Sequence, residues 1–195
     1  GPGINDFTVR IATVNGTGSA SANGLLMKAI FRMGVPVVGK NIFPSNIQGL
    51  PTWYEIRVTG DGYAGRDGEI HFVIAMNPET YEDDLAELAP GGVLLYDSTW
   101  PRPQLLSRPD VTVIGAPLSA MCNDAFKAAR SRILMKNMAY VGAAAALLNL
   151  DLSVIEQLVT EMFAGKEKLI PLNMQAVALG HDYAKQNFKC PLDFR

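Results

Sequence analysis

The sequence predicts an α/β protein in which an open, mainly parallel sheet is followed by a cluster of C-terminal helices. Over residues 6–117, short apolar runs alternate with helical patterns, an order that gives parallel strands with helices on the faces of the sheet. A glycine-bearing turn joins the first of these strands to the first helix. From about residue 118 onward only helical patterns remain, which predicts the C-terminal cluster over residues 118–188.

The first predicted strand covers residues 7–14, where apolar and polar side chains alternate. Apolar residues from Leu25 to Met33 then recur at helical spacing, and Gly34 stands where a helix C-cap favours glycine. Further strands are predicted over residues 35–39, 53–58, 70–76, 93–97 and 111–115. Residues 60–68 are rich in turn formers and suit a hairpin.

Helix starts and stops complete the prediction. Asn77, Pro78 and Glu79 place an N-cap, a first-turn proline and an acid at one helix start, and this helix should stop within residues 89–92. Residues 137–148 are apolar all round, which predicts a buried helix. Ser153 and Glu156 form a capping-box pattern, and a last helix is expected over residues 168–187. We therefore expect one domain over residues 1–195, a Rossmann-like open sheet with a C-terminal helical cluster and a tail at 189–195.

Charge and hydropathy argue against several function classes. The net charge is −2 and no run of Lys or Arg occurs, so no nucleic-acid partner is expected. The longest apolar stretch, residues 138–148, is far shorter than the ~20 residues of a membrane-spanning helix, so no membrane partner is expected. The N-terminus shows neither a basic region nor an apolar run, so no secretory signal is expected.

The two cysteines cannot form a disulfide framework or a four-thiolate iron–sulfur site. We interpret Cys122 as a small buried hydrophobe and Cys190 as a free thiol, and we expect a reducing, cytoplasmic location. His71 lies in a strand pattern and His181 in the last helix, neither within a metal or hydrolase motif. No catalytic residue and no metal ligand is assigned to this chain.

The glycine-bearing turn is the first candidate ligand site, formed by Asn15, Gly16, Thr17, Gly18 and Ser19. Glycines in such a turn let the backbone bend sharply and approach a phosphate, while helix N-terminal amides face the anion. The pattern differs from G-x-G-x-x-G and lacks the lysine of a P-loop, which argues against ATP hydrolysis. A tight turn that only packs the first helix on the sheet remains the alternative.

A stiff polar loop follows the second strand and is the next candidate. Pro44, Ser45, Gln48 and Gly49 belong to it, and loops in this position line the crevice of an open α/β sheet. In the strand after it, Trp53, Glu55 and Arg57 share one face. Arg57 then either forms an ion pair at the rim or binds a partner subunit or an anion.

Two acidic segments are interpreted as structural. Asp83 and Asp84 are expected in a solvated helical turn as surface charge. Asp97, which precedes Ser98 and Thr99, ends a strand at the edge of the crevice, and a structural role is favoured there.

These segments together resemble the γ subunit, or γ domain, of 2-oxoacid:ferredoxin oxidoreductases, over nearly the whole chain from residue 7 to 188. The most specific part reads Tyr/Phe-Pro-Ser-x-Ile-x-Gly-x-Pro-x-Trp-Tyr-x-x-Arg in the family. Here it is matched by Phe43, Pro44, Ser45, Ile47, Gly49, Pro51, Trp53, Tyr54 and Arg57. The Asn77 helix start and Asn137-Met138, followed by a Gly/Ala-rich helix, are also similar to the family.

The resemblance implies a part in oxidative decarboxylation of a 2-oxoacid, such as pyruvate or 2-oxoglutarate, to an acyl-CoA with reduction of ferredoxin. It places thiamine diphosphate, its magnesium and the iron–sulfur clusters on partner subunits of the α and β type or on ferredoxin-like parts. The γ domain would pack on the α-type part and help position coenzyme A. The tail at 189–195 is similar to the join between γ and α parts in fused members of the family.

One departure concerns the glycine turn itself. The family usually has Gly-x-Gly-Gly-Gln-Gly where this chain has residues 13–18, and Thr17 stands at the Gln position. The turn is thus either a coenzyme contact or a structural bend. Lys40 on the second strand suits a phosphate, such as the 3′-phosphate of coenzyme A.

Two other functions remain open. A purely structural assembly domain would carry large apolar surfaces around Trp53, Tyr54 and Trp100. A stand-alone nucleotide- or NAD-binding protein would need an acidic residue for the ribose at the end of the second strand, where residues 38–41 hold none.

Overall fold

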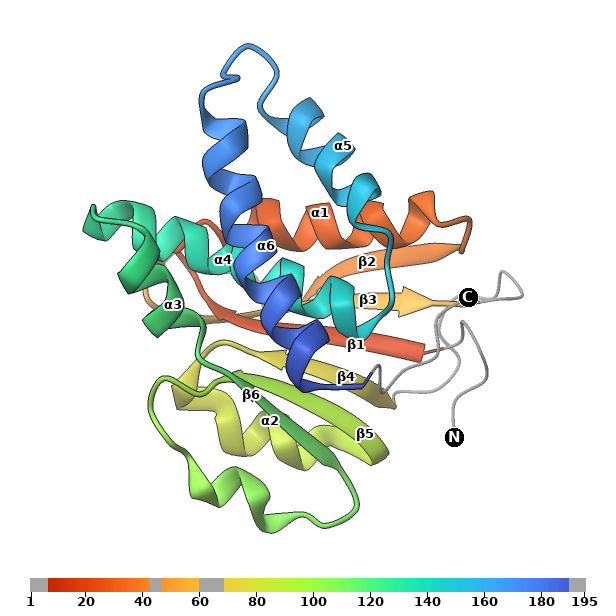
Figure 1. The fold of residues 1–195 in the computed structure, drawn as a ribbon. Helices are drawn as coiled ribbons and strands as arrows, with labels where there is room; N and C mark the ends of the chain where they lie inside the picture. Colours follow the sequence, from red (N-terminus) through yellow and green to blue (C-terminus); the bar gives the residue numbers. More distant parts are fainter. Residues whose placement is uncertain (1–6, 43–46, 60–68, 190–195) are drawn as a thin grey trace.

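The chain folds as a twisted six-stranded sheet with most of its helices massed on one face (Figure 1). The computed structural model describes residues 7–42, 47–59 and 69–189. The strands are β1 (Phe7–Val14), β2 (Val37–Ile42), β3 (Pro51–Val58), β4 (Ile70–Ala75), β5 (Leu88–Asp97) and β6 (Thr112–Ala116). The α-helices are α1 (Ser19–Arg32), α2 (Tyr81–Glu87), α3 (Leu118–Ala125), α4 (Ala129–Leu147), α5 (Leu152–Met162) and α6 (Leu169–Asn187), with 3-10 turns η1 (Pro78–Thr80) and η2 (Pro103–Ser107).

The strand order is β2-β3-β1-β4-β5-β6. The pairs β1–β4, β4–β5 and β5–β6 are parallel, whereas β3 runs antiparallel to both of its neighbours, β1 and β2. Five of the six described strands therefore point the same way. The predicted fold class, an open and mainly parallel sheet with C-terminal helices, is confirmed.

The two faces of the sheet are covered unequally. The helices α1, α3, α4, α5 and α6 form a thick layer on one face, while α2 and the two 3-10 turns cover β4, β5 and β6 on the other (Figure 1). Every residue of β4 is buried because this strand is covered on both sides. On the helix-rich face the core is apolar, with Val9 and Ile11 of β1 beside Phe72 and Ile74 of β4.

The helices α4 and α6 pack unusually close to each other. A Cβ atom at Gly142 would collide with the carbonyl oxygen of Val177, and one at Gly180 would collide with that of Ala139. Because both obstacles are backbone atoms, no side-chain movement can relieve them. The buried helix predicted around residues 137–148 is confirmed, and α4 is fully buried from Asn137 to Ala145.

Most predicted boundaries hold to within a few residues, and the exceptions have physical causes. The second strand lies at Val37–Ile42 rather than over 35–39, because it pairs in register with β3. Asn77 caps the predicted helix start, accepting a hydrogen bond from the Glu79 amide 3.1 Å away. The capping box at Ser153 is wrong: Asp151 is the N-cap of α5, and its carboxylate accepts from the Ser153 amide at 2.9 Å.

Several predictions lie outside the described residues: Pro44 and Ser45, the hairpin at 60–68, Cys190 and the tail beyond residue 189. Over the part of the chain that the structure describes, none of the helices has the length and apolar character needed to span a membrane.

The α4–α6 contact generates a stability prediction. Gly180→Ala forces the two helices apart and should lower the free energy of unfolding by about 3 kcal/mol, despite the better helix propensity of alanine. Gly24→Ala in α1 is the matched control, since its Cβ would meet nothing within 4 Å. That variant should gain about 0.5–1 kcal/mol. Urea unfolding followed by circular dichroism measures both, and equal effects of the two substitutions would contradict the close packing.

Candidate functional site

The glycine turn lies at the carboxyl end of β1 and is joined to the loop that precedes β3. The amide of Asn15 donates to the carbonyl of Leu50 and the amide of Gly49 donates to the carbonyl of Asn15, both at 2.9 Å. The Asn15 side-chain amide donates to the carbonyl of Ile47 at 2.8 Å. These three bonds hold the two loops together as one wall.

The glycines in this turn are required by its shape. Gly16 and Gly18 adopt φ values of 93° and 80°, a left-handed conformation that other residues rarely take. A Cβ on Gly16 would also lie 2.5 Å from the Cγ of Gln48. One on Gly18 would lie 2.8 Å from a methyl group of Leu134 in α4. The turn is therefore in close contact with Gln48 on one side and with Leu134 on the other.

Helix α4 fixes the turn from the other side. The side-chain amide of Asn137, a buried residue, donates to the carbonyl of Thr17 at 2.7 Å. The hydroxyl of Thr17 donates to the Val14 carbonyl at 2.8 Å, and the hydroxyls of Ser19 and Thr13 share a buried hydrogen bond at 2.9 Å. The hydroxyls of Thr17 and Ser19, both in the candidate turn, are thus engaged in hydrogen bonds within the protein.

A cavity of about 390 Å³ opens beside this turn, where β1 and β4 end. Crevices at the carboxyl ends of parallel strands are the usual ligand sites of open α/β sheets. The lining combines apolar, hydroxyl, amide and cationic side chains. It consists of Thr13, Val14, Thr17, Met76, Pro78, Trp100, Ser119, Asn123, Arg132, Ile133, Lys136 and Asn137.

Asp97, at the end of β5, is only 3% exposed and binds two residues that line the cavity, Ser119 and Lys136. Its carboxylate accepts hydrogen bonds from the hydroxyls of Thr99 and Ser119 and from their backbone amides. The ammonium group of Lys136 lies 3.0 Å from the same carboxylate. Burial alone would raise the pKa of Asp97, but Lys136 and these hydrogen bonds outweigh it and hold the pKa below its ordinary value. Asp97 thus ties β5, α3 and α4 together as a charged, fully paired carboxylate.

The structure brings together most of the residues that the sequence singled out, but not all. The two joined loops bring seven of these residues together, and of the seven only Thr17 lines the cavity: Asn15, Gly16, Thr17, Gly18, Ser19, Gln48 and Gly49. Lys40 lies apart from them, exposed on the edge strand β2 opposite Glu55, and does not line the cavity. Pro44 and Ser45 lie outside the described residues.

Sequence reasoning missed the cations of the cavity. Arg132 and Lys136 sit four residues apart on α4, and so do Ile133 and Asn137, so all four side chains reach the cavity. That spacing was readable in the sequence. The spacing shows that these residues share one face of a helix, but it does not show which part of the protein that face contacts. The cavity lining on α4 was missed for this reason.

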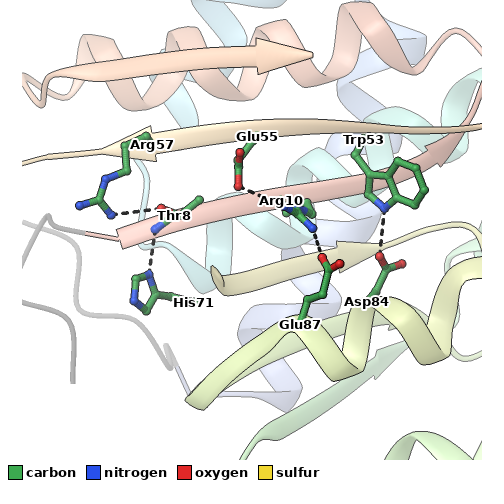
Figure 2. Close-up of polar contacts among 8 residues, drawn as sticks. All are labelled: Thr8, Arg10, Trp53, Glu55, Arg57, His71, Asp84 and Glu87. Atoms are coloured by element: carbon green, nitrogen blue, oxygen red, sulfur yellow. Dashed lines mark hydrogen bonds and ion pairs between the residues drawn. The ribbon is translucent and has the colours of Figure 1, made fainter. Parts of the chain in front are cut away.

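A second group of polar residues lies on the face of the sheet that α2 covers, and it includes side chains of β3 (Figure 2). Arg57 donates to the hydroxyl of Thr8 at 3.1 Å, and Arg10 bridges Glu55 and Glu87. Arg57 thus shares a face with Glu55 and Trp53 as predicted. The Arg10–Glu87 ion pair links the sheet to α2.

The interpretation of Asp84 as surface charge is wrong. Asp84 is 1% exposed and accepts hydrogen bonds from the indole of Trp53 at 3.0 Å and the hydroxyl of Thr80 at 2.8 Å. Burial raises the pKa of this carboxyl despite those bonds. Its neighbour Asp83 is exposed, as expected.

Cys122 and His71 are structural, as the sequence indicated. Cys122 is 1% exposed, and burial together with the nearby Asp97 charge raises its pKa to about 11, so the thiol is unreactive at neutral pH. His71 accepts a hydrogen bond at Nδ1 from the Thr8 amide at 3.0 Å. Among the described residues, no group of three or more His, Cys, Asp or Glu side chains is arranged to hold a metal ion.

Comparison with known proteins shows a consistent relationship. The family model described as pyruvate ferredoxin/flavodoxin oxidoreductase matches residues 8–183. The α subunit of 2-oxoacid:ferredoxin oxidoreductase 2 from Aeropyrum pernix is 25% identical, over 95% of this chain and 35% of its own length. The chain therefore spans about a third of that curated relative.

Solved structures share the fold. The 2-oxoglutarate:ferredoxin oxidoreductase from Magnetococcus marinus, solved with 2-oxoglutarate, coenzyme A and succinyl-CoA bound, superposes with a TM-score of 0.83 at 24% identity. The match covers 98% of this chain and 33% of that one. The γ subunit of a keto/oxoacid ferredoxin oxidoreductase from Geobacter sulfurreducens gives a TM-score of 0.71 at 19% identity, covering 91% of this chain and 98% of that one.

The paired carboxylate at Asp97 makes a pH-dependent prediction. Asp97→Asn removes the charge that compensates Lys136 and should lower the free energy of unfolding by about 3 kcal/mol at pH 7. Because the folded pKa of Asp97 is depressed, this stabilisation is complete above the unfolded pKa of ~3.9 and is lost as the pH falls through the folded value. The difference between wild type and variant should therefore shrink in acid.

Urea unfolding over a pH series tests this, with Asp83→Asn as the control. Asp83 is exposed on α2, and its variant should stay within about 0.5 kcal/mol of wild type at every pH. A wild-type advantage over Asp97→Asn that is independent of pH would contradict the assignment of a stabilising charge to Asp97.

Proposed function

The chain belongs to the pyruvate ferredoxin/flavodoxin oxidoreductase family, and we propose that it is the γ-type component of a 2-oxoacid:ferredoxin oxidoreductase. In this role it assembles with α- and β-type partners and positions coenzyme A. Decarboxylation of the 2-oxoacid and transfer of electrons to ferredoxin take place on those partners. The chain contributes binding and orientation rather than a nucleophile or general base.

The observation that carries the coenzyme role is the cavity at the strand ends. A volume of about 390 Å³ lies within the range of ligand pockets, and its wall combines cations with hydroxyl and amide groups. Apolar surface from Met76, Trp100 and Ile133 lies beside these polar groups. A ligand that joins phosphates to apolar segments, as coenzyme A does, matches such a wall.

The other cofactors of the family fit poorly on this chain. A four-thiolate iron–sulfur cluster needs more cysteines than the two present, and Cys122 is a buried thiol with a raised pKa. Thiamine diphosphate binds together with magnesium, and among the described residues no group of three or more His, Cys, Asp or Glu side chains is arranged to hold a metal ion. We therefore assign these groups to the α- and β-type partners.

An assembly function is the second candidate and is favoured by a separate observation. Large apolar side chains are exposed near the cavity: Ile47 and Ile133 at 64% and 55%, Trp100 at 56%, and Leu50 and Leu134 at about 40%. Exposed apolar patches rimmed by polar groups are typical of protein interfaces. Trp53 and Tyr54, in contrast, are half-buried and hydrogen-bonded to Asp84 and to the Met27 sulfur.

A stand-alone NAD-binding function is disfavoured by the topology. The dinucleotide fold places an acidic residue at the end of the strand beside the first one. In this chain β1 lies between β3 and β4, so β2, which also lacks a carboxylate, is not its neighbour.

Calorimetric titration of the chain with coenzyme A, 3′-dephospho-coenzyme A and NAD tests the proposal. We expect coenzyme A to bind with a Kd on the order of micromolar, and NAD to give no saturable heat. Saturable NAD binding without coenzyme A binding would contradict the coenzyme role. Absence of binding by all three ligands would leave assembly as the function of the isolated chain.

A further inference from the structure

Two cations line the cavity, and their surroundings differ. Lys136 is paired with the buried carboxylate of Asp97 at 3.0 Å, so its charge is largely compensated inside the wall. The side chain of Lys136 is also only 26% exposed. The ion pair is a strut between β5 and α4 rather than a source of net positive charge for a ligand.

Arg132 is held differently. Its Nε donates to the backbone carbonyl of Phe126 at 2.7 Å, across the short connection between α3 and α4. Within the described residues, no carboxylate oxygen lies within 4.0 Å of its guanidinium. The net positive charge of the cavity wall therefore resides on Arg132.

The tether through Nε matters because a guanidinium is planar. Fixing Nε to a backbone carbonyl restricts the plane of the group and leaves its two terminal nitrogens as donors. Such a fork matches two oxygens of one phosphate, and a charge-assisted, two-pronged hydrogen bond is stronger than a neutral one. A lysine at this position would have neither the Nε donor nor the fork.

We propose that Arg132 is the phosphate receptor of this cavity and that Lys136 and Asp97 form a neutral strut that keeps the wall in place. The ligand class is a phosphate ester or diphosphate. The side-chain amide of Asn123, which also lines the cavity, supplies a further donor for a group with three or more oxygens. The identity of the ligand as coenzyme A rests on the proposed function. The binding of a phosphate group by Arg132 does not depend on it.

The test compares four variants by calorimetric titration with coenzyme A and with inorganic pyrophosphate. Arg132→Met should weaken binding of both by about 30-fold, the effect of losing a charged hydrogen-bonding partner. Arg132→Lys, which keeps the charge but loses the fork and the tether, should still weaken binding about fivefold or more. The double variant Asp97→Asn/Lys136→Met, which removes the ion pair without leaving an unpaired charge, should lower thermal stability yet weaken binding by less than about threefold. Arg130→Met, on the same helix but outside the cavity lining, is the charge-matched control and should bind as wild type does.

The outcomes separate the inference from the proposed function. Pyrophosphate binding that depends on Arg132, with no binding of coenzyme A, supports the phosphate receptor and contradicts the coenzyme role. Coenzyme A binding that is unchanged in Arg132→Met overturns the receptor and leaves the coenzyme role standing. A loss in the double variant Asp97→Asn/Lys136→Met equal to that in Arg132→Met also overturns it, as does a wild-type chain that binds neither probe.

Discussion

The arrangement of this molecule depends on the close approach of α4 and α6. Gly142 and Gly180 let the two backbones meet where any side chain would collide with a carbonyl oxygen. Helix α4 packs against α6, α1 and α3 and is buried from Asn137 to Ala145. The first turns of α4 then reach the strand ends, where Arg132 and Lys136 line the cavity and Asn137 holds the glycine turn. A packing constraint in the core thus positions every cation of the candidate site.

The buried carboxylate of Asp97 is the second feature that holds the cavity wall together. A carboxylate as buried as Asp97 is costly unless it is paired and hydrogen-bonded, and here two hydroxyls, two amides and Lys136 share that task. These partners come from the loop after β5, from α3 and from α4, so the charge joins three separate segments of the chain. The same pairing makes Lys136 part of the wall and leaves Arg132 as the cation that faces a ligand.

The sequence predicted the fold class and the glycine turn well because both depend on local patterns: strand alternation, helix caps and residues with positive φ. It did not predict relations that depend on strand order. Because the antiparallel β3 lies between β1 and β2, Lys40 lies two strands away from β1, the strand that ends in the glycine turn. Asp84 was misjudged for a similar reason, since only the packing of α2 against β3 shows that Trp53 covers it. The sequence alone does not show whether a charged residue on a helix faces solvent or a neighbouring strand.

The strand order also explains why the continuous motif formed by β3 and the loop before it contacts two separate parts of the structure. The residues before β3 buttress the glycine turn, through Ile47, Gly49 and Leu50. Within β3, side chains alternate between faces, so Tyr54 contacts α1 while Trp53 hydrogen-bonds to α2 on the other side of the sheet. Displacing this strand would loosen the cavity wall and both covering layers together. The motif is therefore better understood as the frame that holds the site than as the site itself, and the cation proposed to meet a ligand, Arg132, comes from α4.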